Sequence, residues 1–169
     1  MIFADSTGLE LSGERFLTVS ILFKNLLEKE VKNQNIGLLL PSTVAGAFIN
    51  YSVLMMGKTL VNLNYTSEIN SLKTAIESAQ IKTIITSKKF IEKLENKGIN
   101  IKEILEMAEV IYVEDLKEKI SRPKGIFTYF SVKLMPSFLL KSIHLTKTSK
   151  ENTVLILFSS GSEGTPKGV

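Results

Sequence analysis

The sequence has 169 residues, of which 44% are hydrophobic and 22% are charged, a balance typical of one soluble globular domain. It contains 0 Cys, which excludes a disulfide framework and thiolate metal sites and fits a reducing cytoplasm. The formal net charge of +4 is compatible with anionic nucleotides, acidic proteins or lipid headgroups, and it gives no reason to expect nucleic acid as a partner.

The first predicted elements are a hairpin and two helices around one strand. Residues 2–11 predict a short hairpin about the turn-forming cluster 5–8. Ser12 is the expected N-cap of a helix over 13–30, whose apolar residues recur at helical spacing. The continuous apolar run 36–40 predicts a buried parallel strand. A helix then follows up to Met56, and Gly57 ends it.

Strands and helices alternate through the rest of the chain. The expected strands are 60–63, 81–86, 110–113 and 153–158, and the expected helices are 66–79, a lysine-rich one ending at about 97, and 101–108. Residues 121–150 are expected to be less regular. This alternation predicts an α/β fold, with a mostly parallel sheet of about five strands and helices on both faces.

No targeting or membrane-spanning segment is predicted. A signal peptide requires a basic region followed by an apolar one, and the first eight residues contain neither. The longest apolar candidate, 126–143, is interrupted by Lys133, Pro136 and Lys141. We therefore expect a cytoplasmic protein.

The segment after the last predicted strand carries the residues that point to chemistry. It reads Phe158-Ser159-Ser160-Gly161-Ser162-Glu163-Gly164-Thr165-Pro166-Lys167-Gly168-Val169. Glycines let backbone N–H groups approach oxygens closely, hydroxyls donate hydrogen bonds, and lysine adds a compact positive charge. A P-loop is excluded because Gly168, and not Ser or Thr, follows Lys167. A dinucleotide fingerprint is excluded because two residues separate Gly161 from Gly164.

The segment resembles the signature of the adenylate-forming superfamily, which includes acyl-CoA synthetases, luciferases and peptide-synthetase adenylation domains. The family pattern is Ser/Thr-Ser-Gly-Ser/Thr-Thr-Gly-x-Pro-Lys-Gly-Val, and Glu163 departs from it where many members carry Thr. The Ser162-Glu163-Gly164 form and the string 62–66 are similar to the branch of bifunctional 2-acylglycerophosphoethanolamine acyltransferase/acyl-[acyl-carrier-protein] synthetases. The ATP phosphate-binding residues implied by the resemblance are Ser159, Ser160, Gly161, Ser162, Glu163, Gly164, Thr165, Lys167 and Gly168.

The resemblance implies a two-step ligase reaction with ATP and Mg²⁺. A fatty acid carboxylate attacks the α-phosphate of ATP to give an acyl-adenylate, and a thiol of acyl carrier protein or CoA then takes the acyl group. The family's Tyr-Gly-x-Thr-Glu string, ribose-binding Asp and C-terminal catalytic Lys are absent from the sequence. Residues 1–169 are therefore expected to be the N-terminal portion of the AMP-binding domain, ending at the phosphate loop, with no complete set of catalytic residues. A stand-alone phosphate-binding module and a membrane-surface domain with a vestigial loop are the alternatives.

Several further residues have two possible readings. For His144 a surface or linker position is favoured over a catalytic base, and for Met55 core packing over lining an acyl pocket. For Asn62 and Asn64 capping of a turn is favoured over facing a ligand. The lysines at 88, 89, 93 and 97 are expected to form a solvated helix face rather than a docking patch.

The segment 124–141 has the composition of an interfacial helix. Its apolar residues can share one face if it is helical, Lys124, Lys133 and Lys141 supply cationic edges, and Pro136 is expected to kink it. Burial within a complete enzyme is the favoured reading, contact with the inner face of the cell membrane comes second, and disorder third. The apolar residues concerned are Ile126, Phe127, Phe130, Leu134, Phe138 and Leu139.

Overall fold

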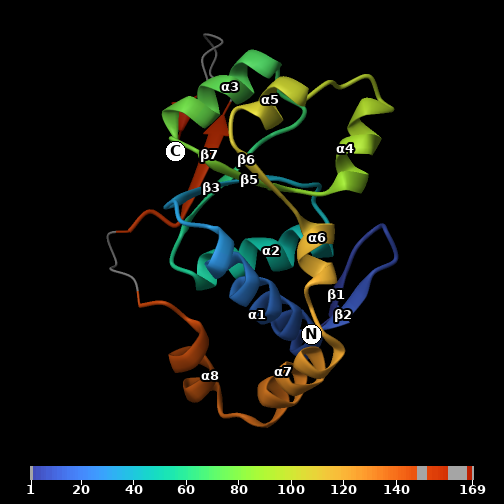
Figure 1. Ribbon diagram of the computed structural model, residues 1–169, viewed down its shortest axis with the longest axis vertical. Coiled ribbons are helices and arrows are strands. Elements are labelled where there is room, and N and C mark those ends of the chain that lie inside the picture. The colour runs from blue at the N-terminus through green and yellow to red at the C-terminus, as the bar shows by residue number, and fades with distance from the viewer. Residues whose placement is uncertain (1, 148–151, 160–166, 169) are drawn as a thin grey trace. The chain divides into compact units, whose positions relative to one another are not determined.

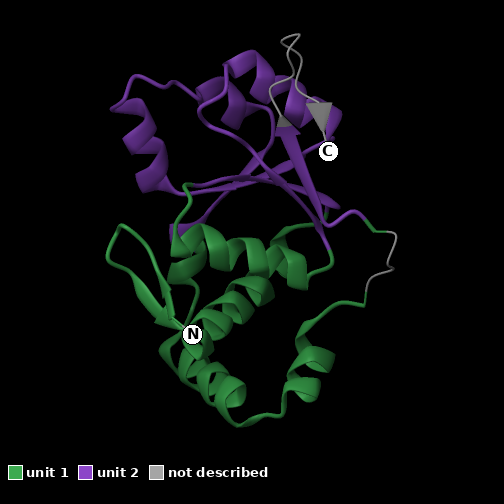
Figure 2. Ribbon diagram, turned by 180° about the vertical axis from the view of Figure 1, so that it is seen from behind, with its two compact units in different colours: residues 1–32, 41–57, 116–152 green, residues 33–40, 58–115, 153–169 purple. Residues whose placement is uncertain are grey.

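The computed structural model describes residues 2–147, 152–159 and 167–168 (Figure 1). The chain divides into two compact units (Figure 2). Unit 1 comprises Met1–Lys32, Pro41–Gly57 and Leu116–Asn152, and unit 2 comprises Asn33–Leu40, Lys58–Asp115 and Thr153–Val169. Each unit is therefore assembled from three stretches of sequence.

Unit 2 is built on a six-stranded sheet in the order β6-β5-β3-β4-β7-β8. The first five strands are parallel to their neighbours, and β8 runs antiparallel to β7. The central strand β3 pairs with β4 through Ile36↔Leu60 and with β5 through Ile36↔Thr83. The strands are β3 (Asn35–Leu39), β4 (Thr59–Asn62), β5 (Thr83–Thr86), β6 (Glu109–Tyr112), β7 (Leu155–Ser159) and β8 (Lys167–Gly168).

Three helices of unit 2 contribute to its core, namely α3 (Ile69–Ser78), α4 (Lys88–Glu95) and α5 (Lys102–Glu106). Ser87 caps α4, because its Oγ accepts a hydrogen bond from the N–H of Phe90 at 3.3 Å. The helices bury apolar residues at helical spacing against the β-branched strands. The buried hydrophobic core of unit 2 consists of Leu39, Val61, Leu63, Leu72, Ala75, Ile76, Ala79, Ile81, Ile84, Phe90, Leu94, Ile101 and Ile104.

Unit 1 begins with a hairpin and two packed helices. Strands β1 (Ile2–Ala4) and β2 (Glu10–Ser12) pair antiparallel about a turn in which Gly8 has φ +81°. Helix α1 (Gly13–Glu30) starts at the N-cap Ser12, as predicted. Helix α2 (Val44–Met55) starts at Thr43, and the N–H of Val44 donates to Asp5 Oδ2 at 2.6 Å. The Ser52 hydroxyl joins the helices by donating to the carbonyl of Ser20 at 2.9 Å.

The prediction that 121–150 is less regular is wrong over most of the segment. It forms α7 (Arg122–Leu134) and α8 (Ser137–His144), and the short helix α6 (Val113–Glu118), also unpredicted, precedes them. Pro136 does not kink one helix but separates two. Helix α7 ends at Leu134 because the residue before a proline is disfavoured in helical conformation, and Pro136 is the N-cap residue of α8.

The predicted fold class is confirmed, since the protein has an α/β fold with five parallel strands. The added antiparallel strand β8 was not predicted. In the described part of the chain, the helices are all too short or too polar to span a bilayer.

Candidate functional site

The signature segment leaves the sheet at the end of β7. Strand β7 lies parallel to β4, with Leu155 opposite Leu60 and Leu157 opposite Asn62. The chain returns in β8, where Ser159 is paired with Lys167 and Phe158 with Gly168. The segment is therefore held closed at its base, because its first and last residues are paired across two strands.

The signature residues themselves are described only in part. For Ser159, Lys167 and Gly168 the structure gives the backbone pairing. Ser160, Gly161, Ser162, Glu163, Gly164 and Thr165 lie outside the described residues. The described base places the segment at the carboxyl end of a parallel strand, which is the edge of open α/β sheets where ligands bind.

The neighbouring strand β4 also ends at this edge. Asn64, two residues beyond β4, accepts hydrogen bonds through its Oδ1 from the Thr66 N–H at 3.1 Å and the Thr66 hydroxyl at 2.7 Å. The carbonyl of Asn64 also accepts from the N–H of Ser67 at 3.0 Å. Capping of a turn, the favoured reading, is confirmed for Asn64. Asn62 lies half-buried on β4.

The N-terminus of α4, which follows β5, is capped by the carboxylate of Glu114, a residue of α6 that comes directly after β6. Glu114 accepts hydrogen bonds from the Ser87 hydroxyl at 2.7 Å and from the N–H groups of Lys88 at 3.0 Å and Lys89 at 3.4 Å. Burial opposes ionisation of Glu114, but these hydrogen bonds outweigh it and hold the pKa of Glu114 below its usual range. The start of α4 is thus satisfied by the chain itself and is not free for a phosphate.

Replacing Glu114 by glutamine should lower the free energy of unfolding by about 1 kcal/mol, because a charged acceptor for orphan N–H groups is lost. A depressed pKa contributes stability at neutral pH, and this contribution disappears as the pH falls through the folded-state pKa. Urea unfolding from pH 7 to pH 3 should therefore show a shallower acid loss for Glu114→Gln than for the wild type. Glu92→Gln, at an exposed position on α4, the helix that Glu114 caps from α6, is the control. Identical pH profiles for Glu114→Gln and the wild type would contradict this role.

The lysine-rich face of α4 has a partly structural role. Lys88 forms an ion pair with Asp115, and its Nζ lies 5.4 Å from the centre of the Tyr112 ring. Lys89, Lys93 and Lys97 are exposed, which agrees with the expected solvated face at these three positions.

Among the residues that the structure describes, none is placed as a catalytic base. His144 is half-buried at the end of α8, and Met55 is buried at the end of α2, as core packing predicts. Among the described residues, no three His, Cys, Asp or Glu side chains gather in a way that could hold a metal ion.

Comparison with known proteins identifies the family. Residues 23–169 match the family described as AMP-binding enzyme. The fold is similar to that of VinN, with a TM-score of 0.67 and 17% identity over 100% of this chain and 40% of that chain. It is also similar to the N-terminal subdomain of Klebsiella oxytoca NpsA in complex with 3-hydroxyanthranilyl-AMSN, with a TM-score of 0.66 and 13% identity over 96% and 34% of the two chains.

A third similar structure is a Mycobacterium tuberculosis fatty acyl CoA synthetase, with a TM-score of 0.64 and 16% identity over 97% of this chain and 29% of that chain. The chain thus spans well under half the length of each of these structures. At these identities the similarity establishes the fold, and the family match covers the whole of unit 2's sheet together with the signature segment. The chain belongs to the AMP-binding enzyme family.

Proposed function

We propose that residues 1–169 are the N-terminal portion of the adenylation domain of a longer ATP-dependent acyl ligase. The enzyme activates a fatty acid as an acyl-adenylate and passes the acyl group to the thiol of acyl carrier protein or CoA. It works in the cytoplasm with ATP and Mg²⁺. The structures to which the chain is similar are longer proteins, of which it covers 29% to 40%.

The observation that carries this proposal is the position of the signature segment. A family-type phosphate loop begins where β7 ends, and the pairing of Ser159 with Lys167 closes its base. A loop closed in this way can direct its backbone N–H groups toward one point without a large entropic cost on binding. The chemistry of its residues fits a polyphosphate, since they offer glycine N–H groups, hydroxyls and one lysine.

We assign this loop to positioning and electrostatic stabilisation. Backbone N–H groups at Gly161 and Gly164, with the hydroxyls of Ser159, Ser160, Ser162 and Thr165, would hold the β- and γ-phosphates of ATP. Lys167 would stabilise the charge that develops as pyrophosphate departs. A carboxylate at Glu163 is repelled by a triphosphate unless it points away or shares a cation such as Mg²⁺.

The proposal extends to one branch of the family. Ser162-Glu163-Gly164 and the string 62–66 are similar to the bifunctional 2-acylglycerophosphoethanolamine acyltransferase/acyl-[acyl-carrier-protein] synthetases. This similarity favours acyl carrier protein as the thiol partner and a link to phospholipid metabolism. The similarity to a fatty acyl CoA synthetase supports an acyl substrate without choosing between the two thiols.

Residues 1–169 alone should not form an acyl-adenylate, because the ribose-binding and C-terminal catalytic motifs of the family are not among them. The measurement is fatty-acid-dependent exchange of pyrophosphate into ATP by the isolated chain and by the complete protein. We expect exchange by the complete protein only. Exchange above background by residues 1–169 would show that the missing motifs are dispensable. ATP binding without exchange by the complete protein would favour a phosphate-binding module.

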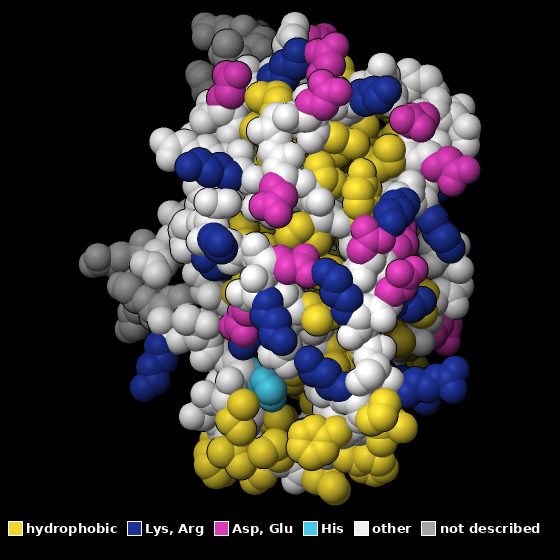
Figure 3. Space-filling model, in the orientation of Figure 1, with side chains coloured by type: hydrophobic (Ala, Val, Ile, Leu, Met, Phe, Trp, Pro, Cys, Tyr) yellow, Lys and Arg dark blue, Asp and Glu magenta, His cyan; other side chains and the backbone are white. Residues whose placement is uncertain are grey.

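We also propose that α7 and α8 contact an anionic membrane surface. The support is a set of apolar side chains that these helices turn to solvent, including Phe127 at 73%, Leu134 at 75% and Phe138 at 72% exposure, while Thr128 of α7 is buried (Figure 3). Between Glu118 and Glu151 the sequence has no Asp or Glu. The cations there are Lys119, Arg122, Lys124, Lys133, Lys141, Lys147 and Lys150.

With this composition, contact with an anionic membrane is more favourable than exposure to water. The apolar side chains insert between lipid headgroups, and the lysines are attracted to the negative charge of those headgroups. Replacing Phe127 and Phe138 by serine should weaken binding to phosphatidylglycerol-containing vesicles by at least about tenfold, since each buried Phe contributes about 1.5–3 kcal/mol. Co-sedimentation measures it, with Ile2→Ser, at an exposed position on β1, as the control. Unchanged sedimentation of the double variant, or no binding by the wild type, would favour burial in a complete enzyme.

A further inference from the structure

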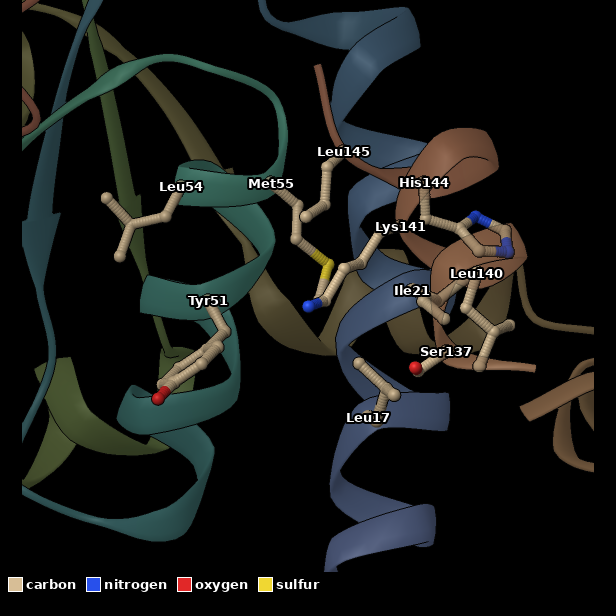
Figure 4. A pocket seen from close by; sticks show the side chains of 10 residues that line it. All are labelled: Leu17, Ile21, Tyr51, Leu54, Met55, Ser137, Leu140, Lys141, His144 and Leu145. Atoms are coloured by element: carbon tan, nitrogen blue, oxygen red, sulfur yellow. The ribbon is translucent and has the colours of Figure 1, made fainter. Parts of the chain in front are cut away.

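Unit 1 contains a cavity of about 400 Å³ between α1, α2 and α8 (Figure 4). Its size lies within the range of small-molecule sites. The side chains that line it are Leu17, Ile21, Tyr51, Leu54, Met55, Ser137, Leu140, Lys141, His144 and Leu145. All of them belong to unit 1 and none to the signature segment.

The lining is almost entirely apolar, and α8 contributes most of its few polar atoms. Helix α1 contributes Leu17 and Ile21, and α2 contributes Met55 with the large, solvent-accessible side chains of Tyr51 and Leu54. The polar atoms come mainly from Ser137, Lys141 and His144, which all lie on α8. The cavity is therefore apolar, with a small polar and basic part on α8 beside Leu140.

The charge in this cavity comes from Lys141. Its side chain extends into the cavity toward Met55 (Figure 4). Within the described ranges no carboxylate forms an ion pair with Lys141, whereas nearby on α1 Lys24 is already paired with Glu28 at 2.7 Å. Burial first, and repulsion from Lys24 second, lower the pKa of His144 against the opposing effect of Glu28, which favours the neutral imidazole. Lys141 is itself exposed, so an anion entering the cavity would meet a solvent-accessible ammonium group that forms no ion pair with a described carboxylate.

We propose that this cavity binds a single-chain anionic amphiphile, with its acyl chain against α1 and α2 and its carboxylate or phosphate at Lys141 Nζ. Apolar walls favour the chain, and the unpaired ammonium selects an anion over a neutral or cationic headgroup. If a methylene group occupies about the 30 Å³ of a water molecule in the liquid, the cavity of about 400 Å³ holds roughly 13 such groups, so a chain of 12 carbons fits. The proposal is independent of the ligase reaction, because binding is measured without ATP.

The test is calorimetric titration of the chain with dodecanoate below its critical micelle concentration. We expect saturable binding that weakens about tenfold in Lys141→Met, which removes the charge and keeps the chain length. Lys29→Met, an exposed lysine on α1 outside the cavity, should bind as the wild type does. Dodecyltrimethylammonium, with the same chain and the opposite charge, should bind more weakly to the wild type than dodecanoate does.

A second variant tests the place of binding without removing a charge. Leu54→Trp should fill the cavity and weaken dodecanoate binding by at least about tenfold, and because the wild-type sequence has 0 Trp its fluorescence also reports on the site. Leu54 is 40% exposed, so the fold tolerates the larger ring, and Leu9→Trp at 38% exposure is the matched control.

Dodecanoyl lysophosphatidate, titrated in parallel, distinguishes a lipid source from a free fatty acid, since the anion that binds more tightly identifies the ligand. The proposal is overturned if neither anion binds saturably. It is also overturned if Lys141→Met and Lys29→Met lose affinity equally, or if both tryptophan variants bind as the wild type does.

Discussion

In the complete enzyme, Lys167→Ala should reduce the rate of acyl-adenylate formation by about 10²–10³, which is the cost of removing one electrostatic stabiliser that acts in the transition state. ATP binding should weaken much less. Lys167 is the cation that the signature segment carries, and its backbone is fixed opposite Ser159 at the base of the loop.

The rate of acyl-adenylate formation should fall more than ATP binding does because the charge near Lys167 develops during the reaction. In water an ammonium group attracts a phosphate weakly, but in a partly closed site the effective dielectric constant is lower and the attraction grows. As pyrophosphate departs, negative charge accumulates on the group that Lys167 is proposed to contact. An interaction that strengthens in the transition state affects the rate more than it affects binding.

The control for Lys167 is the second half-reaction. Thiol transfer from a supplied acyl-adenylate should be nearly unchanged in Lys167→Ala, because the β- and γ-phosphates have already left. Lys97→Ala, at an exposed lysine after α4, should leave both half-reactions unchanged. Equal losses in both half-reactions, or no loss in adenylation, would return Lys167 to a solvated surface position.

The second large effect concerns the sheet that carries the loop. Gly37→Val should lower the free energy of unfolding by about 2–3 kcal/mol, since extra methyl groups in a close-packed core are costly. Gly37 is buried on the central strand β3, and a Cβ there would lie 3.0 Å from Ile81 Cγ2 and 3.2 Å from both Ile84 Cγ1 and Leu63 Cδ1. These neighbours lie in the core of unit 2.

A matched glycine separates this crowding from the general effect of adding a side chain. Gly125 in α7 has no heavy atom within 4 Å of a Cβ built on it, so Gly125→Val should be neutral or slightly stabilising. Chemical unfolding of both variants gives the comparison. If Gly37→Val were as stable as Gly125→Val, the packing described around β3 would be wrong.

The sequence is sufficient to predict the elements whose signal is local. The run 36–40 is apolar on every residue, as a strand buried on both faces must be, and β3 lies at Asn35–Leu39. Ser12 precedes an apolar repeat and caps α1. The signature segment could be identified because its Gly, Ser and Lys spacing is specific by itself.

Features that depend on distant residues could not be predicted in this way. Glu114 caps a helix whose first residue, Lys88, is 26 positions away. Strand β8 lies in a segment dense in glycine and hydroxyl residues, so its pairing with β7 has no hydrophobic alternation to reveal it. The apolar spacing over 124–141 allows a helix, but it does not show that Phe127 and Phe138 stay exposed or that Pro136 separates two helices.

His144 and Met55 illustrate the same limit at the cavity. Each was expected to be a surface or core residue, and each lines a space formed by helices from separate parts of the sequence. The residue type at a single position carries no sign of what will face that side chain after folding.

The most direct test of the central claim is to identify the product formed by the complete protein with ATP, Mg²⁺ and a fatty acid when no thiol is present. The account predicts an acyl-adenylate and pyrophosphate, detected by mass spectrometry and by trapping with hydroxylamine as the acyl hydroxamate, and both should fall sharply in Lys167→Ala. Release of ADP and phosphate, or the absence of an acyl-adenylate with fatty acids of every chain length, would contradict it.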